Sequence, residues 1–271
     1  MAGVMNFNVL GRKFLIVKLL VMFLLSMVSS PAAEPTVLEL MKKLEGLMEQ
    51  GTDITARVRF VQQRVNQGVK VTESIYFRRD RDDAFLIIMT APDTDKGNGY
   101  LRLGDNFWMY RRNTRTFQHI NRDETISGTD VKAGDMEKKK FTDQYEPLTN
   151  DTHTEYAVKK TITLLKQTPE VYNFTVVAKV RDVTYPKQEY WVDVNTALPL
   201  KVQNFSKSGD LMQTAWYYQY TQIKGKYVMV LSKFEDEFEK GNVTVMKLSE
   251  INLEKISDTV FTKAYLENAS R

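Results

Sequence analysis

The chain of 271 residues contains no cysteine and only two histidines, His119 and His153. Without cysteine there can be no disulfide, no Cys–His nucleophile and no thiolate-bound zinc, so these stabilisers and sites are excluded. An N-terminal lipid thioether is excluded for the same reason. The stability of the chain must therefore come from a packed core, and its length is sufficient for one.

Sequence motifs of enzyme active sites are missing as well. The chain has no Gly-x-Ser-x-Gly, no Gly-x-Gly-x-x-Gly and no phosphate-binding loop. Its aspartate-rich segment, residues 80–83, lacks the glycine and terminal glutamate of a calcium loop. We therefore expect a protein that is not an enzyme and that binds no cofactor and no metal. A secreted hydrolase remains the alternative, since a pair of catalytic carboxylates needs no local motif.

Charge is sparse at the N-terminus, where Arg12, Lys13 and Lys18 are the only charged residues among the first 33. A short apolar run and a stretch of small residues follow them. This order predicts a cleaved secretory signal peptide over residues 1–33. An uncleaved anchor is the alternative, but the apolar run is shorter than the roughly 20 residues that a membrane span needs.

The remaining chain, residues 34–271, is almost neutral. It keeps 35 of the 38 Lys and Arg residues against 34 Asp and Glu. Nucleic-acid binding needs clustered net positive charge, so we expect no nucleic-acid partner.

The pattern of apolar residues predicts one helix followed by a long series of strands. Thr36 caps a run of helical spacing that Gly51 ends, so residues 36–49 should form an amphipathic helix. From Ile54 onward the apolar period is two, which indicates about ten strands in an antiparallel meander. A sheet of that size curls, and the helix can fill its concave side. The expected fold is mainly β: a half-open antiparallel barrel closed by the N-terminal helix.

Three other segments depart from simple alternation. Residues 84–89 and 107–110 are apolar at every position, so both faces of these strands should be covered, one by the hollow and the other by a helix or neighbouring segment. Residues 121–153 are irregular, and Asp135 could cap a short helix through Lys140. Residues 262–268 should form a short C-terminal helix.

Three stretches resemble the LolA-like family of outer-membrane lipoprotein-sorting proteins. They are APDTDKGNGYLRLGDNFWMYRRNTRTFQHI at 91–120, YWVDVNTALPLKVQNFSKSGDL at 190–211 and VFTKAYLEN at 260–268. The resemblance implies a half-open β-barrel with a helical lid and an apolar cavity over residues 34–271. One departure lies within residues 126–141, where Gly128-Thr129-Asp130-Val131 replaces the Gly-Ser-Asp-Phe-like turn of the family.

The same resemblance implies a periplasmic, monomeric carrier. Its cargo would be the acyl chains of a lipoprotein or another lipid, moved towards the outer membrane between an inner-membrane exporter and an outer-membrane acceptor. A carrier must hide its cargo because each exposed CH₂ group costs about 0.8 kcal/mol in water. A lipid or lipoprotein sensor on the same scaffold, signalling to a membrane partner, is the alternative.

Strand phase suggests which residues would line the cavity, although plain core packing is the commoner use of such side chains. The candidates are aromatic residues on predicted strands: Phe60, Phe77, Trp108, Tyr110, Trp191 and Trp216.

Overall fold

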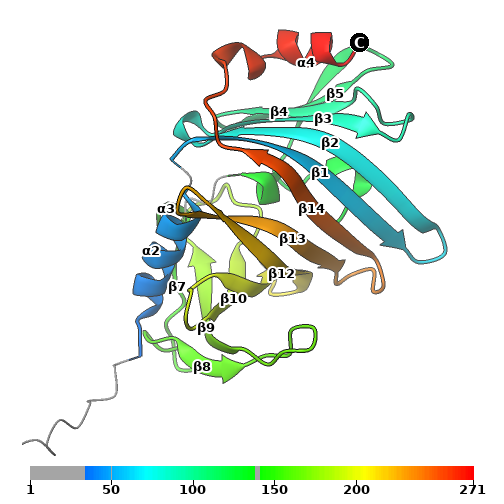
Figure 1. Ribbon diagram of the computed structural model, residues 1–271. Coiled ribbons are helices and arrows are strands. Elements are labelled where there is room, and N and C mark those ends of the chain that lie inside the picture. The colour runs from blue at the N-terminus through cyan, green and yellow to red at the C-terminus, as the bar shows by residue number, and fades with distance from the viewer. Residues whose placement is uncertain (1–33, 50, 138–140) are drawn as a thin grey trace, which may run out of the picture. The chain divides into compact units, whose positions relative to one another are not determined.

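The strands pair into one antiparallel sheet that is built from two meanders (Figure 1). The computed structural model describes residues 34–49, 51–137 and 141–271, of which Pro35–Arg271 form one compact unit. The strand order is β6-β5-β4-β3-β2-β1-β14-β13-β12-β11-β10-β9-β7, with β8 also paired to β9. The first strand therefore pairs with the last, and β6 and β7 stand at opposite ends of an unclosed sheet.

The strands of the first meander run outward from the middle of the sheet. Their bounds are β1 Asp53–Arg64, β2 Gly68–Arg79, β3 Ala84–Ala91, β4 Gly99–Leu103, β5 Asn106–Arg111 and β6 Thr116–Ile120. Two short strands follow at the far edge, β7 Tyr145–Pro147 and β8 Val158–Thr161. The second meander comprises β9 Glu170–Ala178, β10 Lys187–Asp193, β11 Pro199–Phe205, β12 Leu211–Ile223, β13 Lys226–Asp236 and β14 Val243–Asn252.

Helical segments are few in the described part of the chain. The α-helices are α2 Val37–Met48, α3 Phe141–Gln144 and α4 Lys263–Ala269, and short 3-10 turns lie at η1 Asp80–Asp82, η2 Ile126–Gly128, η3 Ala133–Met136 and η4 Asp258–Val260.

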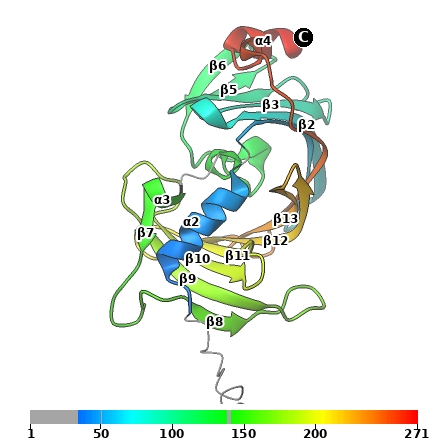
Figure 2. The same cartoon turned by 60° about the vertical axis from the view of Figure 1, so that its left-hand side comes forward.

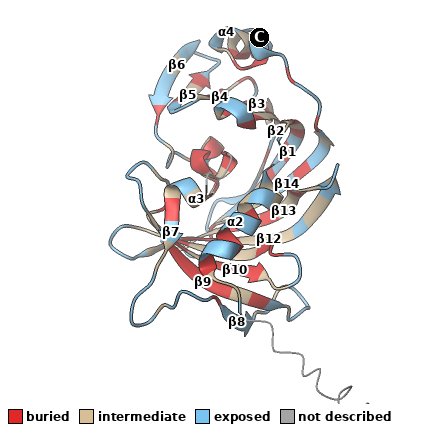
Figure 3. Cartoon of the chain, turned by 90° about the vertical axis from the view of Figure 1, so that its left-hand side faces the viewer, coloured by how far each residue is buried: buried red, intermediate tan, exposed pale blue. Residues whose placement is uncertain are grey.

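Helix α2 lies on the concave face of the sheet, as Figure 2 shows. A reciprocal capping box begins it: Thr36 Oγ1 accepts from the Glu39 amide at 3.2 Å, and Glu39 Oε2 accepts from the Thr36 amide at 2.8 Å. Its buried stripe, Val37, Leu40, Met41 and Leu44, joins the main core cluster. Figure 3 shows that the buried positions of the helix are those turned towards the sheet.

The second apolar cluster lies on the opposite face of the first meander, under α4. In β3, Phe85 and Ile87 belong to the main core, whereas Leu86 and Ile88 pack in this second cluster with Leu266 of α4. The C-terminal helix therefore covers the other face of the strand that is apolar at every position, as Figure 1 shows. The packing is close at Gly99, where an added Cβ would lie 2.5 Å from Leu266 Cδ1.

The observed fold tests several predictions that were made from the sequence. The mainly β class, the helix at 36–49 and the C-terminal helix are confirmed, and Thr262 caps the latter. The described residues form fourteen strands, so the prediction of about ten was too low. Strands as short as β7 and β8 give no readable alternation, which explains why they escape a pattern search.

The prediction of a short helix beginning at Asp135 is wrong for the described residues of that stretch. Asp135 lies instead inside the 3-10 turn Ala133–Met136, where its side chain accepts a hydrogen bond from the Lys132 amide. Residues 138–140 of that prediction lie outside the described residues, as does the predicted signal peptide at 1–33.

Candidate functional site

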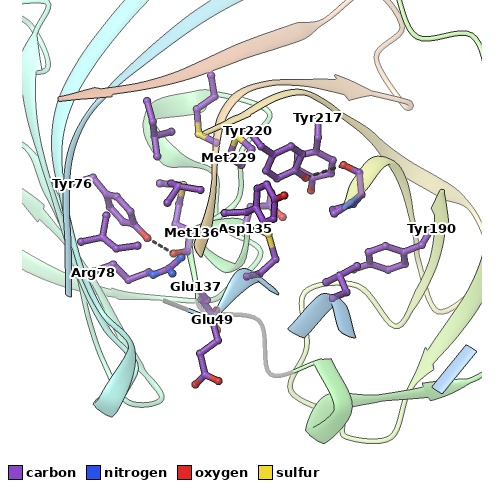
Figure 4. Close-up of a pocket in the computed structure, with 18 residues that line it drawn as sticks. Glu49, Tyr76, Arg78, Asp135, Met136, Glu137, Tyr190, Tyr217, Tyr220 and Met229 are labelled. Carbon is purple, nitrogen blue, oxygen red and sulfur yellow. Dashed lines mark hydrogen bonds between the residues drawn. The ribbon is translucent and has the colours of Figure 1, made fainter. Parts of the chain in front are cut away.

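A cavity of about 140 Å³ lies between the concave face of the sheet, the C-terminal end of α2 and the turn Ala133–Met136 (Figure 4). Its walls come from β1, β2 and β10–β14 together with these two covering segments. Pockets that enclose drug-sized ligands usually measure about 300–1,000 Å³, so this cavity is too small for a long acyl chain as it stands.

Most of the cavity wall is apolar and deformable. Methionine is prominent, and its unbranched, polarizable side chain adapts to ligands of different shapes. The apolar lining residues are Leu44, Met48, Ile54, Met136, Pro199, Val228, Met229, Met246 and Leu248.

Tyrosine supplies the second part of the wall, through Tyr76, Tyr190, Tyr217, Tyr220 and Tyr227. The Tyr76 hydroxyl donates to the Met136 carbonyl at 2.6 Å, and the Tyr220 hydroxyl donates to the Pro199 carbonyl at 2.8 Å. Burial raises the pKa of Tyr76 to about 12 and also raises the pKa values of Tyr190, Tyr217 and Tyr220. These hydroxyls therefore stay protonated and can donate hydrogen bonds.

Two charged lining residues are neutralised by partners. Arg78 Nε lies 2.7 Å from Asp80 Oδ1, and Glu137 pairs with Arg102 and, at 2.8 Å, with Arg122. Both pairs are largely buried, so removing one member would leave an uncompensated charge inside the protein. These pairs fix the wall in place.

The segment that carries Met136 is anchored firmly to the sheet. Asp130, 6% exposed at its side chain, lies 2.8 Å from Arg64 Nη1 and accepts from Thr244 Oγ1 at 2.7 Å. The Gln213 amide donates to the Asp130 carbonyl at 2.6 Å. The anchor is thus the aspartate that this turn shares with the family pattern: Asp130 is held from two strands, β1 and β14.

The end of α2 is tied less firmly. Lys226 Nζ donates to the Gly46 carbonyl at 3.2 Å in an exposed contact, and Thr142 Oγ1 donates to Glu45 Oε2 at 2.6 Å. An exposed hydrogen bond contributes little because water competes for both groups. Of the two segments that cover the cavity, the helix end is the one that can move at lower cost.

The six aromatic candidates from the sequence lie apart from one another. None of them is among the described residues that line this cavity, although Phe60 is fully buried in the same core. Phe77, Trp108 and Tyr110 pack in the cluster under α4, where Lys263 Nζ lies 4.2 Å from the Trp108 ring centroid. Ligand binding by the six residues stays a prediction.

Trp191 and Trp216 lie on the outer face of the sheet, on either side of a lysine. Lys201 Nζ is 4.2 Å from the Trp191 ring centroid and 5.1 Å from that of Trp216, while Trp216 Nε1 donates to Glu235 at 2.8 Å. Their neighbours Tyr190 and Ala215, with the opposite phase, belong to the core.

An irregularity in β12 hid the actual lining from the sequence pattern. Simple alternation groups Tyr220 with Trp216, on the face opposite Tyr217. The register of β12 against β13 shifts around Gln219, so Tyr217 and Tyr220 both reach the cavity. No residue of the local sequence marks this bulge; the missed lining tyrosines had no signal beyond their abundance in one strand.

The comparisons with known proteins agree with this geometry. A family model described as an uncharacterized protein family matches residues 81–268, which is more than half of the chain. A LolA superfamily protein from Nitrosomonas europaea superposes with a TM-score of 0.70 at 20% identity, covering 85% of this chain and 99% of that one. The chain belongs to the family of this model, and its fold is that of the LolA superfamily structure.

Other solved structures share the LolA-like fold. An outer membrane lipoprotein-sorting protein domain from Vibrio parahaemolyticus gives a TM-score of 0.71 at 17% identity, covering 85% of this chain and 97% of its own. A DUF1329 family protein from Desulfovibrio piger gives 0.72 at 17% identity, covering 84% and 96%. No curated protein matches this LolA-like chain. Within residues 34–49, 51–137 and 141–271, no helix combines the length and apolarity that a bilayer span requires.

Proposed function

We propose that this LolA-like protein is a periplasmic carrier that shelters an acyl chain of a lipoprotein, or of another lipid, on its way towards the outer membrane. The observation that carries the proposal is the methionine- and tyrosine-lined cavity under α2. Hiding an acyl chain there removes its CH₂ groups from water, at about 0.8 kcal/mol each. The names of the similar structures, a lipoprotein-sorting domain among them, support the same class of cargo.

Loading requires the cavity to widen, and α2 is the part that would move. Its C-terminal half is held by an exposed contact at Gly46 and a part-buried one at Glu45, whereas Asp130 and Glu137 hold the opposite cover through more deeply buried pairs. The helix and the segment 126–136 would thus act together as the lid implied by the family. A carrier that works this way holds the hydrocarbon chain by non-directional contacts and can release it at low cost.

A filled cavity should abolish binding. In the Met246→Trp variant the larger side chain occupies the space between β14 and α2, because Met246 lines the cavity. We expect the affinity for a fluorescent fatty-acyl probe to fall at least about tenfold, the equivalent of 1.4 kcal/mol in binding free energy. The matched control is Val245→Trp, which places the same side chain one residue away on the outer face of β14.

Lipid carried in the cell gives the independent check. Protein purified from the periplasm should yield co-purified acyl lipid by mass spectrometry, and the Met246→Trp protein should yield much less. If the wild-type protein carries no lipid and neither variant changes probe binding, the carrier proposal is wrong. A regulatory membrane partner recovered in place of an exporter would point to the sensor alternative.

A further inference from the structure

The cavity wall contains one hydroxyl that the protein itself does not use. Among the described tyrosines of the wall, those at 76, 190 and 220 donate to protein acceptors, and Tyr227 also has a partner. Tyr217, half-buried and facing the cavity (Figure 4), makes no hydrogen bond with the described residues; its ring only packs against Tyr220 at 6.5 Å between centroids. A donor left free inside an apolar cavity is a position for a ligand acceptor.

The carboxylate of Asp135 offers the complementary group. Three uncharged donors, the Lys132 amide, the Tyr185 hydroxyl and the Gln213 side chain, all reach its Oδ2 atom, at 2.9, 3.2 and 3.3 Å. Oδ1 accepts no hydrogen bond from the described residues, and no described lysine or arginine lies within ion-pair distance of Asp135. Asp135 and Tyr217 both line the cavity (Figure 4), and burial first, then the charge of Asp135, raises the pKa of Tyr217.

We call these two residues the polar station of the cavity, because among the described lining residues they offer a ligand an unused hydroxyl and an unused carboxylate oxygen. The station can donate one hydrogen bond, from Tyr217, and accept one, at Asp135. Among the described lining residues nothing neutralises an anion, because Asp135 is an acid and the one cation, Arg78, is already paired with Asp80. Two carboxylates in one low-dielectric site repel strongly.

We infer that the cavity selects acyl chains whose polar head carries both a donor and an acceptor and no negative charge, such as an amide-linked chain, and that it rejects fatty-acid anions. The inference rests on the proposed carrier function and names its substrate class. The head would lie between Tyr217 and Asp135, and the chain would run along the methionine side of the wall.

Three probes with the same hydrocarbon chain separate the possibilities. Oleamide has a neutral donor and acceptor, methyl oleate has an acceptor alone, and oleate is an anion at neutral pH. Displacement of a fluorescent acyl probe from the purified full chain should rank them oleamide, then methyl oleate, then oleate, with steps of about fivefold, a typical value for one hydrogen bond.

Two variants test the roles of the two residues. Tyr217→Phe should weaken oleamide and methyl oleate about fivefold and leave oleate unchanged, since only an unused hydroxyl is lost. Asp135→Asn should strengthen oleate about tenfold by removing the negative charge, while its amide oxygen still accepts from the three neutral donors. The control is Tyr218→Phe, the same change on the outer side of β12, with thermal unfolding measured for every variant.

The outcomes distinguish this inference from the carrier proposal. If none of the three probes displaces the acyl probe, the carrier function itself fails. If oleate binds the wild-type chain as tightly as oleamide, or if both variants keep the wild-type ranking, the protein remains a carrier but the head-group selectivity is wrong.

Discussion

At the scale of single residues, two glycines have opposite roles although both lack a side chain. Gly99 faces Leu266 Cδ1 and the Ile87 carbonyl, which an added Cβ would approach to 2.5 and 2.7 Å. Gly46, on the exposed side of α2, has nothing within 4 Å of such an atom. One glycine therefore permits close packing of α4, whereas the other only loosens a helix.

This difference gives a paired prediction. Gly99→Ala should lower the free energy of unfolding by about 1–3 kcal/mol, because backbone and helix must shift to admit the methyl group. Gly46→Ala should raise it by about 0.5–1 kcal/mol, since alanine is the better helix former. Urea unfolding measures both, and a Gly99→Ala protein as stable as wild type would show that α4 does not pack against β4 as described.

The sequence could predict the residues of the cavity wall only in part. A strand that is apolar throughout, such as residues 107–110, does not show which of its faces points inward. Trp108 therefore looked equivalent to a cavity residue, although it lies under α4 beside Lys263. Tyr217 and Asp135 were out of reach for another reason: their nearness depends on a bulge in β12 and on a 3-10 turn, and neither has a sequence period.

At the scale of elements, the sequence predicted best where periodicity extended over many residues. The capping residue Thr36 and the apolar stripe behind it define α2, and the turn at residues 66–68 joins β1 to β2 as expected. The pairing of β1 with β14 could not be read in this way, since alternation specifies a strand but not its neighbour.

The two covers of the cavity should differ in local stability. Amide hydrogens in the last turn of α2 should exchange faster than those of residues 126–136, because an exposed and a part-buried side-chain contact hold the former and buried ion pairs hold the latter. Hydrogen exchange followed by mass spectrometry resolves the two segments. Loading with an acyl lipid should slow exchange in the α2 segment. Faster exchange in 126–136 than in α2 would show that residues 126–136, and not α2, are the cover that moves.

At the scale of the whole molecule, the buried tyrosines make stability depend on alkaline pH. The pKa of Tyr76 is raised to about 12 by burial, and those of Tyr145, Tyr185, Tyr190 and Tyr217 are also raised above the ordinary value. An unfolded phenol ionises near pH 10, at roughly two pH units below the folded Tyr76. Above that pH the unfolded chain binds fewer protons than the folded chain, so the free energy of unfolding must fall as pH rises.

The expected result is a constant stability contribution from these groups below about pH 10 and a steep loss between about pH 10 and 12. Tyrosinate absorbance and circular dichroism should change together, since the buried phenols ionise only as the fold opens. Appearance of most of the tyrosinate signal while the circular dichroism spectrum stays native would show that these side chains already reach water.

The contact between β1 and β14 also has a consequence for how the chain is made. Thr55 is paired with Asn252 and Gln63 with Val243, so the central ladder joins residues from opposite ends of the polypeptide. A nascent chain emerges N-terminus first, and β1 keeps a bare edge until the last strand has been synthesised. Such long-range pairing delays folding. Under the periplasmic location proposed above, this delay would keep the chain extended while it crosses the inner membrane.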